Sequence, residues 1–174
     1  MLPQSFEHKT ACCFTGHRPA GLPARGDERD PRMDRLKYRL LHCVEEAMQK
    51  GVRAFLCGGA AGFDLLAAEA VVALRPYWPQ ARLLLALPFP AQADGWPIQL
   101  RRRYDAMLEE ADELSYVSQA GGVHALLKRN RYLVEHADCC IAYLSKASGG
   151  TLYTVNYALD RGLPYFNLYE SAYN

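Results

Sequence analysis

A chain of 174 residues with 50% hydrophobic and 22% charged side chains is long and apolar enough to bury one large core. This composition excludes an intrinsically disordered chain, which would carry fewer hydrophobic residues and a larger net charge. The formal net charge is +1, so the overall charge favours no polyanionic partner, although a local basic site is compatible with it. We expect a single domain over residues 1–174.

The N-terminal segment contains Glu7, His8 and Lys9 and has no apolar stretch of the kind found in signal peptides. The longest apolar runs, such as residues 83–87, are far too short to span a bilayer, so we expect a soluble cytoplasmic protein with no membrane partner. The cysteines include two adjacent pairs but no C-x-x-C motif, which predicts small buried hydrophobes rather than metal ligands or disulfides. They are Cys12, Cys13, Cys43, Cys57, Cys139 and Cys140.

Strand-like and helix-like segments alternate along the chain. Short apolar runs predict strands near residues 10–15, 53–57, 82–87, 113–117, 138–144 and 164–167. Apolar residues at helical spacing predict helices along the stripes Met33 to Ala47, Phe63 to Leu74, Trp96 to Ala111, Leu126 to Ala137 and Leu152 to Leu159. Residues 19–31 are expected to form a mobile loop. This alternation predicts an α/β fold, a Rossmann-like three-layer αβα sandwich with a mostly parallel sheet of about six strands.

Ligands of open α/β sheets bind outside the carboxyl ends of the strands, so the residues that follow each strand are the candidate site. Two of these segments, residues 58–64 and 148–151, are glycine-rich and open a helix. A helix N-terminus offers unpaired N–H groups and a partial positive charge, and glycine lets a phosphate approach the backbone closely. The alternative is that the glycines only permit tight packing and that Ser148 or Thr151 caps a helix.

Several single residues have two interpretations. Asp64 either interacts favourably with the helix dipole or accepts a hydrogen bond from a ribose hydroxyl. His17 titrates near neutrality, and we expect it to serve in binding or in the loop rather than as an acid or base. Asn130 lies on an apolar stripe and needs partners, either a neighbouring loop or a ligand. Trp96 belongs either to the core or to the wall of a base pocket.

Two basic clusters can be interpreted either as ligand-binding groups or as solvated surface residues. Among Lys128, Arg129 and Arg131, one side chain is expected to reach a ligand while the others are solvated. Residues 101–103, three consecutive arginines, are expected to form a solvated helix face rather than a binding patch. The complete set of ligand-binding candidates is Thr15, Gly16, His17, Arg18, Gly58, Gly59, Gly62, Asp64, Pro88, Phe89, Arg129, Asn130, Ser148, Gly149, Gly150, Thr151 and Thr154.

Taken in order, the segments "CCFTGHRP", "CGGAAGFD", "LPFPAQADGW", "KRNRYLVEHAD" and "SGGTLYT" resemble the SLOG superfamily. This superfamily unites the DNA-processing protein DprA with the LOG nucleoside-monophosphate phosphoribohydrolases, and the similarity is greatest to the bacterial YpsA/YoqJ-like proteins. The resemblance covers nearly the whole chain and implies a Rossmann-like domain that binds nucleotides or their derivatives. It implies that residues 58–64 match the second-strand turn and residues 149–151 the phosphate-cradling turn. Arg129 falls at the place of the catalytic arginine of LOG enzymes.

One position departs from the pattern of the LOG enzymes. Three residues after the threonine of the G-T pair they carry a glutamate, and this chain has Thr154 there. A hydroxyl group cannot supply the carboxylate chemistry that cleavage of a glycosidic bond needs. We therefore predict a binding protein rather than an enzyme and assign no catalytic residue. We also expect no metal site.

Three functions follow, in order of preference. The first is a nucleotide sensor or regulatory protein, with a nucleotide or ADP-ribose-like ligand and no certain cofactor. The second is a hydrolase or transferase acting on a nucleotide N-glycosidic or phosphate bond, with Glu69, Asp64 or His17 as acid or base. The third is a DprA-like module for single-stranded DNA, which the near-neutral charge disfavours. Tyr165, Tyr169 and Tyr173 either cover the sheet or form a homodimer contact.

Overall fold

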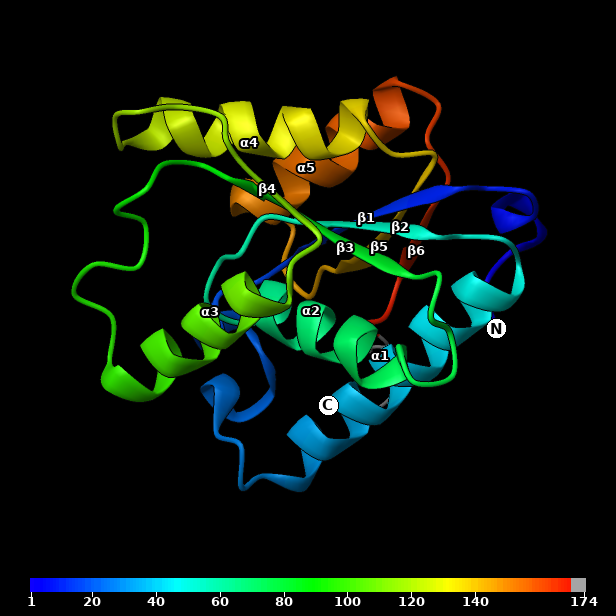
Figure 1. Ribbon diagram of the computed structural model, residues 1–174, viewed down its shortest axis with the longest axis horizontal. Helices are drawn as coiled ribbons and strands as arrows, with labels where there is room; N and C mark the ends of the chain where they lie inside the picture. The colour runs from blue at the N-terminus through cyan, green and yellow to red at the C-terminus, as the bar shows by residue number, and fades with distance from the viewer. Residues whose placement is uncertain (170–174) are drawn as a thin grey trace.

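The computed structural model describes residues 1–169 and shows a six-stranded sheet between two layers of helices (Figure 1). The strands lie in the order β4-β3-β2-β1-β5-β6, and every neighbouring pair is parallel. Their bounds are β1 Ala11–Gly16, β2 Ala54–Cys57, β3 Arg82–Leu87, β4 Glu113–Tyr116, β5 Cys139–Tyr143 and β6 Tyr165–Asn167. The predicted Rossmann-like α/β fold is confirmed.

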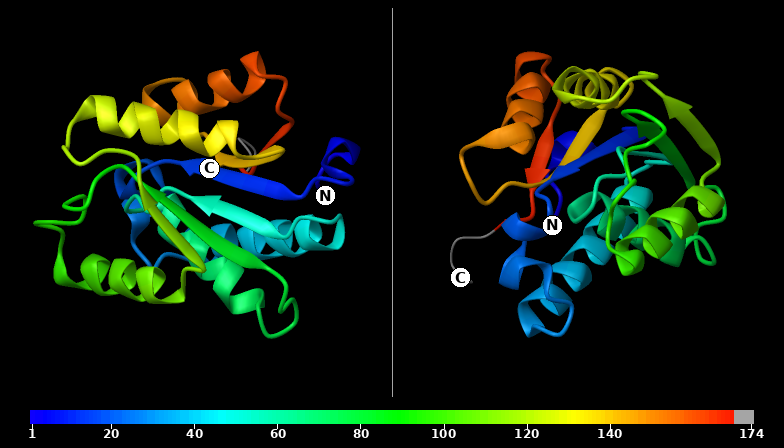
Figure 2. Two further views of the ribbon diagram at one scale, coloured as in Figure 1. Left: turned by 45° about the horizontal axis from the view of Figure 1, so that its top comes forward. Right: turned by 90° about the vertical axis from the view of Figure 1, so that its left-hand side faces the viewer.

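The helices divide between the two faces of the sheet according to their place in the chain (Figure 2). Helices α1 to α3 cover one face and helices α4 and α5 cover the other. Their bounds are α1 Pro31–Gln49, α2 Phe63–Leu74, α3 Ile98–Glu110, α4 Val123–Glu135 and α5 Gly149–Asp160. The chain thus passes from one face of the sheet to the other between β4 and β5. Strand β5 lies beside β1, with Gly16 opposite Tyr143 at their carboxyl ends. This is the topological switch point, where open α/β sheets bind their ligands.

Local sequence explains where the elements begin and how they pack. Asp30 caps α1 by accepting a hydrogen bond from the N–H of Arg32 at 2.9 Å, and Pro31 occupies the first turn, where no N–H is needed. The stripe from Met33 to Ala47 is buried as its helical spacing predicts. Strand β5 is buried along its whole length, as expected for a parallel strand covered on both faces. The stacked rings of Phe14 and Phe55 lie in the larger core, beneath α1 to α3.

Three details differ from the expectations. Residues 19–31 contain two short 3-10 helices, Pro19–Gly21 and Pro23–Gly26, and anchor the buried Leu22 in the core, so this stretch is more structured than expected. Helix α3 begins after Trp96, whose ring packs edge-to-face on Tyr104 in the core. Strand β4 is an edge strand with exposed side chains.

All six cysteines are buried and unpaired, which agrees with the interpretation as small core residues. Burial raises the pKa of the Cys43 thiol to about 12, so this group stays protonated near neutrality. In residues 1–169, no helix combines the length and the hydropathy that a membrane crossing needs. Tyr173 lies outside the described residues.

Candidate functional site

A cavity of about 400 Å³ opens at the carboxyl ends of β1 and β5, beside α4 and the start of α5. We call it the switch-point cavity. It brings together candidates from segments that are far apart in the sequence. Its walls are formed by Phe14, Thr15, Gly16, His17, Arg18, Ala20, Gly21, Ala60, Asp64, Leu126, Arg129, Asn130, Leu133, Lys146, Ser148, Gly149, Gly150 and Thr151.

The ring of His17 joins β1 to the first turn of α5. Its Nε2 accepts a hydrogen bond from the N–H of Ser145 at 3.0 Å, so in the neutral ring the proton sits on Nδ1. Nδ1 lies 3.4 Å from Oγ1 of Thr151 and donates to it. Burial and the nearby charge of Lys146 lower the pKa of His17, which favours this neutral form. The histidine therefore positions Thr151 and leaves the threonine hydroxyl proton available to a ligand.

The N-terminus of α5 is open toward the switch-point cavity. Ser148 precedes the helix in an extended conformation, but its side chain makes no capping hydrogen bond. Gly149 has a φ of +82°, a left-handed conformation that favours glycine. The first N–H groups of a helix have no partner within it, and no side chain of residues 1–169 caps them. Together with the helix dipole, they form a suitable site for an anion.

A buried ion pair forms part of the cavity wall. Nη1 of Arg129 lies 3.2 Å from Oδ2 of Asp64, which also accepts a hydrogen bond from the N–H of Ala60 at 3.1 Å. Asp64 is 5% exposed and Arg129 6%. Burial raises the pKa of Asp64, while the charge of Arg129 acts in the opposite direction. The carboxylate is therefore engaged within the protein, and Nε of Arg129 is buried without a hydrogen-bond partner among the described residues.

The glycines that follow β2 make room for neighbouring groups instead of lining the cavity. A Cβ atom at Gly58 would lie only 1.7 Å from Nη1 of Arg129, so the guanidinium occupies the space that a side chain would fill. At Gly59 the nearest atoms belong to the side chains of Leu87 and Met107, and φ is +64°. At Gly62 a Cβ would meet the carbonyl oxygen of His17 at 2.6 Å. These three glycines position the walls of the site.

Three further candidates also lie outside the cavity lining. Oγ1 of Thr154 donates to the carbonyl of Gly150 at 2.8 Å, within α5. The ring of Phe89 lies against Gly121, and Pro88 precedes it in the same loop. The hydrogen bond of Thr154 satisfies its hydroxyl inside the helix.

Lys146 lines the cavity and was missed by sequence reasoning. The signal for it was available, because Lys146 lies three residues after the end of β5, in the segment at the carboxyl edge of the sheet. Three cationic side chains, Arg18, Arg129 and Lys146, face a single carboxylate, Asp64, in the lining. The cavity is thus positively charged although the whole chain is nearly neutral.

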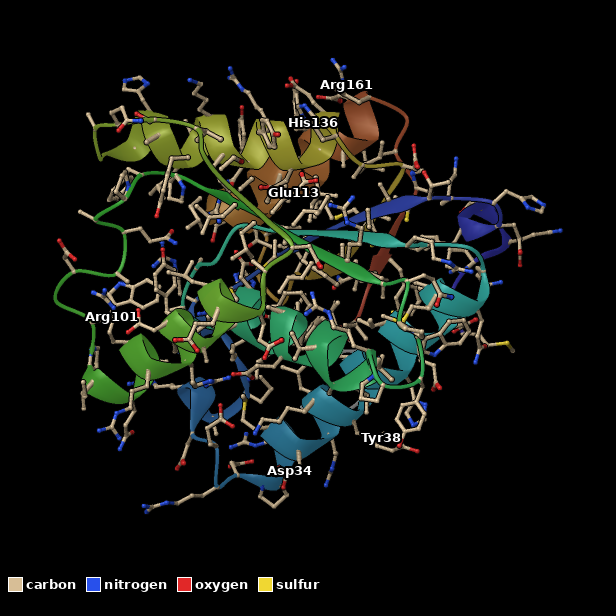
Figure 3. All side chains as sticks on the ribbon, viewed as in Figure 1. Asp34, Tyr38, Arg101, Glu113, His136 and Arg161 are labelled. Carbon is tan, nitrogen blue, oxygen red and sulfur yellow. The ribbon has the colours of Figure 1, made fainter. Side chains whose placement is uncertain are left out.

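The other basic residues form surface ion pairs or contacts. Arg131 donates to the hydroxyl of Tyr153 at 2.6 Å, and Lys128 is exposed on α4. Arg101 donates to Asp105 at 2.8 Å and lies 3.6 Å from Asp94, in the loop that precedes α3 (Figure 3). Arg102 is exposed, but Arg103 pairs with Glu69 at 2.6 Å and with Glu28 at 3.0 Å, so the expectation of a solvated face is wrong for Arg103. None of the three arginines lines the switch-point cavity. Within residues 1–169, no three histidine, cysteine or acidic side chains gather as metal ligands would.

Comparison with solved structures supports the fold. DNA-processing protein A from Helicobacter pylori, whose structure was described for its single-stranded DNA binding mode, superposes with a TM-score of 0.65 at 15% identity. The superposition covers 99% of this chain and 72% of that protein. DNA-processing protein A from Streptococcus pneumoniae gives a TM-score of 0.65 at 14% identity, covering 95% of this chain and 52% of its own. At this identity the likeness shows a shared fold.

Sequence comparison extends the similarity to bacterial relatives. The SPβ prophage-derived protein YoqJ from Bacillus subtilis is 29% identical over 143 residues, covering 75% of this chain and 84% of YoqJ. A UPF0398 protein from Leuconostoc citreum is 25% identical over 132 residues, covering 75% of this chain and 69% of the relative. The family model YpsA, described as the YspA SLOG family, matches residues 12–162. The chain therefore belongs to the YpsA family of SLOG proteins.

Proposed function

We propose that the chain binds a nucleotide or a nucleotide derivative in the switch-point cavity, with a phosphate group at the N-terminus of α5. The observation that carries this proposal is the convergence of the uncapped first turn of α5 with Arg18, Arg129 and Lys146 on one cavity. Backbone N–H groups and cationic side chains are the usual ligands of phosphate in proteins. The volume of about 400 Å³ falls within the range of small-molecule sites.

Two features favour a sensor or regulatory role over catalysis. Asp64 is the only carboxylate in the cavity lining of the described residues, and it is paired with Arg129 and bonded to Ala60. The hydroxyl of Thr154, at the position where LOG enzymes carry a glutamate, is directed to a helix carbonyl. Cleavage of a glycosidic bond needs carboxylates free to accept or donate protons. The cavity therefore suits a ligand that is held and released.

A thermal-shift panel of AMP, ADP, NAD and ADP-ribose tests the proposal. A ligand at a hundred times its dissociation constant stabilises the folded state by about 2.7 kcal/mol, which gives a clear shift. Lys146→Gln should weaken the binding of the active compound about tenfold, since one charge-assisted hydrogen bond is lost. Lys128→Gln removes the same charge from α4 outside the cavity and should leave binding unchanged.

The same mixtures of protein and nucleotide distinguish the sensor from a hydrolase and from a DNA-binding module. Chromatography after incubation should return every nucleotide intact, and appearance of a cleaved product would establish the hydrolase instead. A single-stranded oligonucleotide at low salt should compete no better than AMP. Strong oligonucleotide binding that falls steeply with salt would favour the DNA-binding role. If no compound shifts the unfolding temperature, the proposal is wrong.

A further inference from the structure

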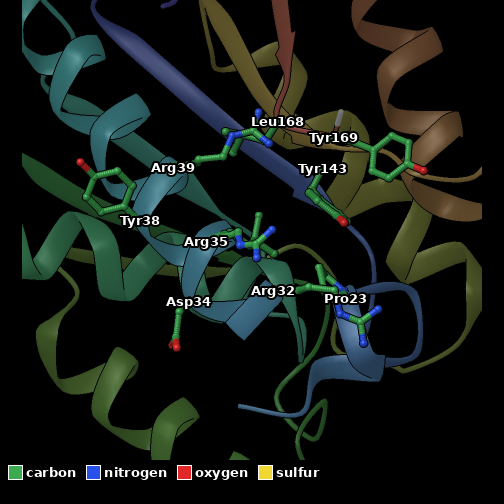
Figure 4. A pocket seen from close by; sticks show the side chains of 10 residues that line it. Pro23, Arg32, Asp34, Arg35, Tyr38, Arg39, Tyr143, Leu168 and Tyr169 are labelled. Carbon is green, nitrogen blue, oxygen red and sulfur yellow. The ribbon is translucent and has the colours of Figure 1, made fainter. Parts of the chain in front are cut away.

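A second cavity, of about 500 Å³, lies on the α1 side of the sheet and is separate from the switch-point cavity (Figure 4). The N-terminal half of α1 forms one wall, and the end of β5 with the segment after β6 forms the other. We call it the α1 pocket and define it by Arg32, Arg35, Arg39, Tyr143, Leu168 and Tyr169.

The wall formed by α1 is cationic. Spacings of three and four residues place Arg32, Arg35 and Arg39 on one face of the helix, and Asp34 is the one carboxylate in the lining among residues 1–169 (Figure 4). Arg32 is paired with Asp30 through two contacts of 2.9 Å. Arg35 makes no hydrogen bond or ion pair with residues 1–169. The guanidinium of Arg35 is therefore the group on this wall that is available to a negative group of a ligand.

The opposite wall supplies an unpartnered hydroxyl group. Tyr143 is only 5% exposed, and its ring is held by contacts with Phe63 and Tyr169. Its hydroxyl lines the pocket and makes no hydrogen bond among the described residues, so it is available to a ligand. Burial raises the pKa of Tyr143, so the phenol keeps its proton and can donate. The hydroxyl of a largely buried side chain thus lines the same pocket as the arginines.

Apart from Asp34, the remaining surface of the pocket is mainly apolar. Leu168 is buried, and the ring of Tyr169 stands edge-on to Tyr143 with 5.8 Å between the ring centres. Sites for small molecules combine such apolar walls with a few fixed polar groups. An inorganic anion would leave these walls in water, whereas an anion with an apolar body would cover them.

We propose that the α1 pocket binds a small organic anion, in which a carboxylate, phosphate or sulfonate group is attached to an aromatic or aliphatic body. The anionic group is held by Arg35 and Arg32 with the hydroxyl of Tyr143, and the body packs on Leu168 and Tyr169. This site is independent of the nucleotide site proposed above. The two are neighbours, because Tyr143 also contacts the ring of His17 edge-to-face at 6.3 Å.

A matched pair of fluorescent probes tests the site in the full chain. 8-Anilinonaphthalene-1-sulfonate carries an aromatic body and an anionic group, and N-phenyl-1-naphthylamine has a similar body without the charge. We expect saturable binding of the sulfonate to one site and binding of the neutral probe that is at least about tenfold weaker. Equal affinity for the two probes, or no saturable binding of the sulfonate, would overturn the proposal.

Single substitutions show which of the two cavities binds the sulfonate probe. Arg35→Gln, at an exposed position, and Tyr143→Phe, which keeps the ring contacts, should each weaken binding of the sulfonate, by about tenfold for Arg35→Gln. Arg102→Gln removes an exposed arginine from α3, and Lys146→Gln removes a charge from the switch-point cavity. Both controls should bind the sulfonate as the unaltered chain does. Weaker binding in Lys146→Gln with normal binding in Arg35→Gln would place the probe in the other cavity and refute the site.

Discussion

Nη1 of Arg129 lies 3.2 Å from Oδ2 of Asp64, and this ion pair joins α4 to α2 in the wall of the switch-point cavity. The pair is buried, so each charge depends on the other for its stability inside the protein. It also explains two features of the sequence at once. Glycine is needed at position 58 because the guanidinium of Arg129 occupies the space that a side chain would fill. Asp64, in the first turn of α2, supplies the carboxylate that pairs with this guanidinium.

The first prediction concerns this ion pair. Arg129→Met should lower the free energy of unfolding by about 3–5 kcal/mol, because it leaves the Asp64 carboxylate buried without its partner. The double variant Arg129→Met with Asp64→Asn should be less destabilised than Arg129→Met alone, since no uncompensated charge remains. Urea unfolding of the variants provides the measurement. A double variant destabilised by the full sum of the two single changes would show that the residues do not act as a pair.

The second prediction contrasts two glycines. Gly58→Ala should destabilise the chain by about 1–3 kcal/mol, because the new methyl group collides with the guanidinium of Arg129. Gly150→Ala should leave stability unchanged or raise it by about 0.4–1 kcal/mol, because its nearest neighbour would be Nδ2 of Asn130 at 3.7 Å. The same Gly150→Ala change adds a methyl group to the cavity lining and should weaken nucleotide binding.

Thermal unfolding and nucleotide titration on these two proteins check both parts. A stable Gly58→Ala protein would mean that Arg129 does not occupy the position described. Unchanged nucleotide affinity in Gly150→Ala would count against a phosphate at this turn.

The third prediction is a dependence of stability on pH that arises at His17. Its pKa in the folded chain is lowered from 6.5 by burial and by Lys146, so the unfolded chain binds more protons near this pH. The contribution of His17 to stability is therefore complete above pH 6.5 and is lost as pH falls through 6.5 toward the lowered value. Protonation of Nε2 of His17 makes this atom a donor. It can then no longer accept the hydrogen bond from the N–H of Ser145.

Urea unfolding between about pH 7.5 and pH 5.5 measures this loss. In His17→Gln the amide oxygen can accept the hydrogen bond from Ser145 without titrating, so the loss of stability in this interval should be smaller. His124→Gln, at an exposed histidine, should retain the loss of the unaltered chain. An equal loss in His17→Gln and the unaltered chain would show that His17 is not responsible.

The fold could be predicted in outline because its signals are local. The alternating apolar runs and helical stripes predicted the elements. The position of an element within the sheet has no such signal. The run near residues 113–117 therefore resembled the inner strands, although β4 lies at the edge with exposed side chains.

The site could be predicted only where a strand end marks it. His17 and residues 148–151 follow strands and line the cavity as expected. The space taken by Arg129 above Gly58 depends on a contact between segments far apart in the chain, which spacing alone does not reveal. For the same reason Gly58 looked like a phosphate-binding glycine. Whether each candidate touches a ligand stays a prediction.

Titration of the ¹⁵N-labelled chain with AMP and ADP-ribose, followed by NMR, tests the central claim most directly. The amide signals of Gly149, Gly150 and Thr151 should move progressively as the phosphate accepts hydrogen bonds from the first turn of α5. Lys146→Gln should require about tenfold more nucleotide for the same change. If saturating nucleotide moves signals elsewhere while these three amides stay fixed, the phosphate does not bind at the start of α5 and the account is wrong.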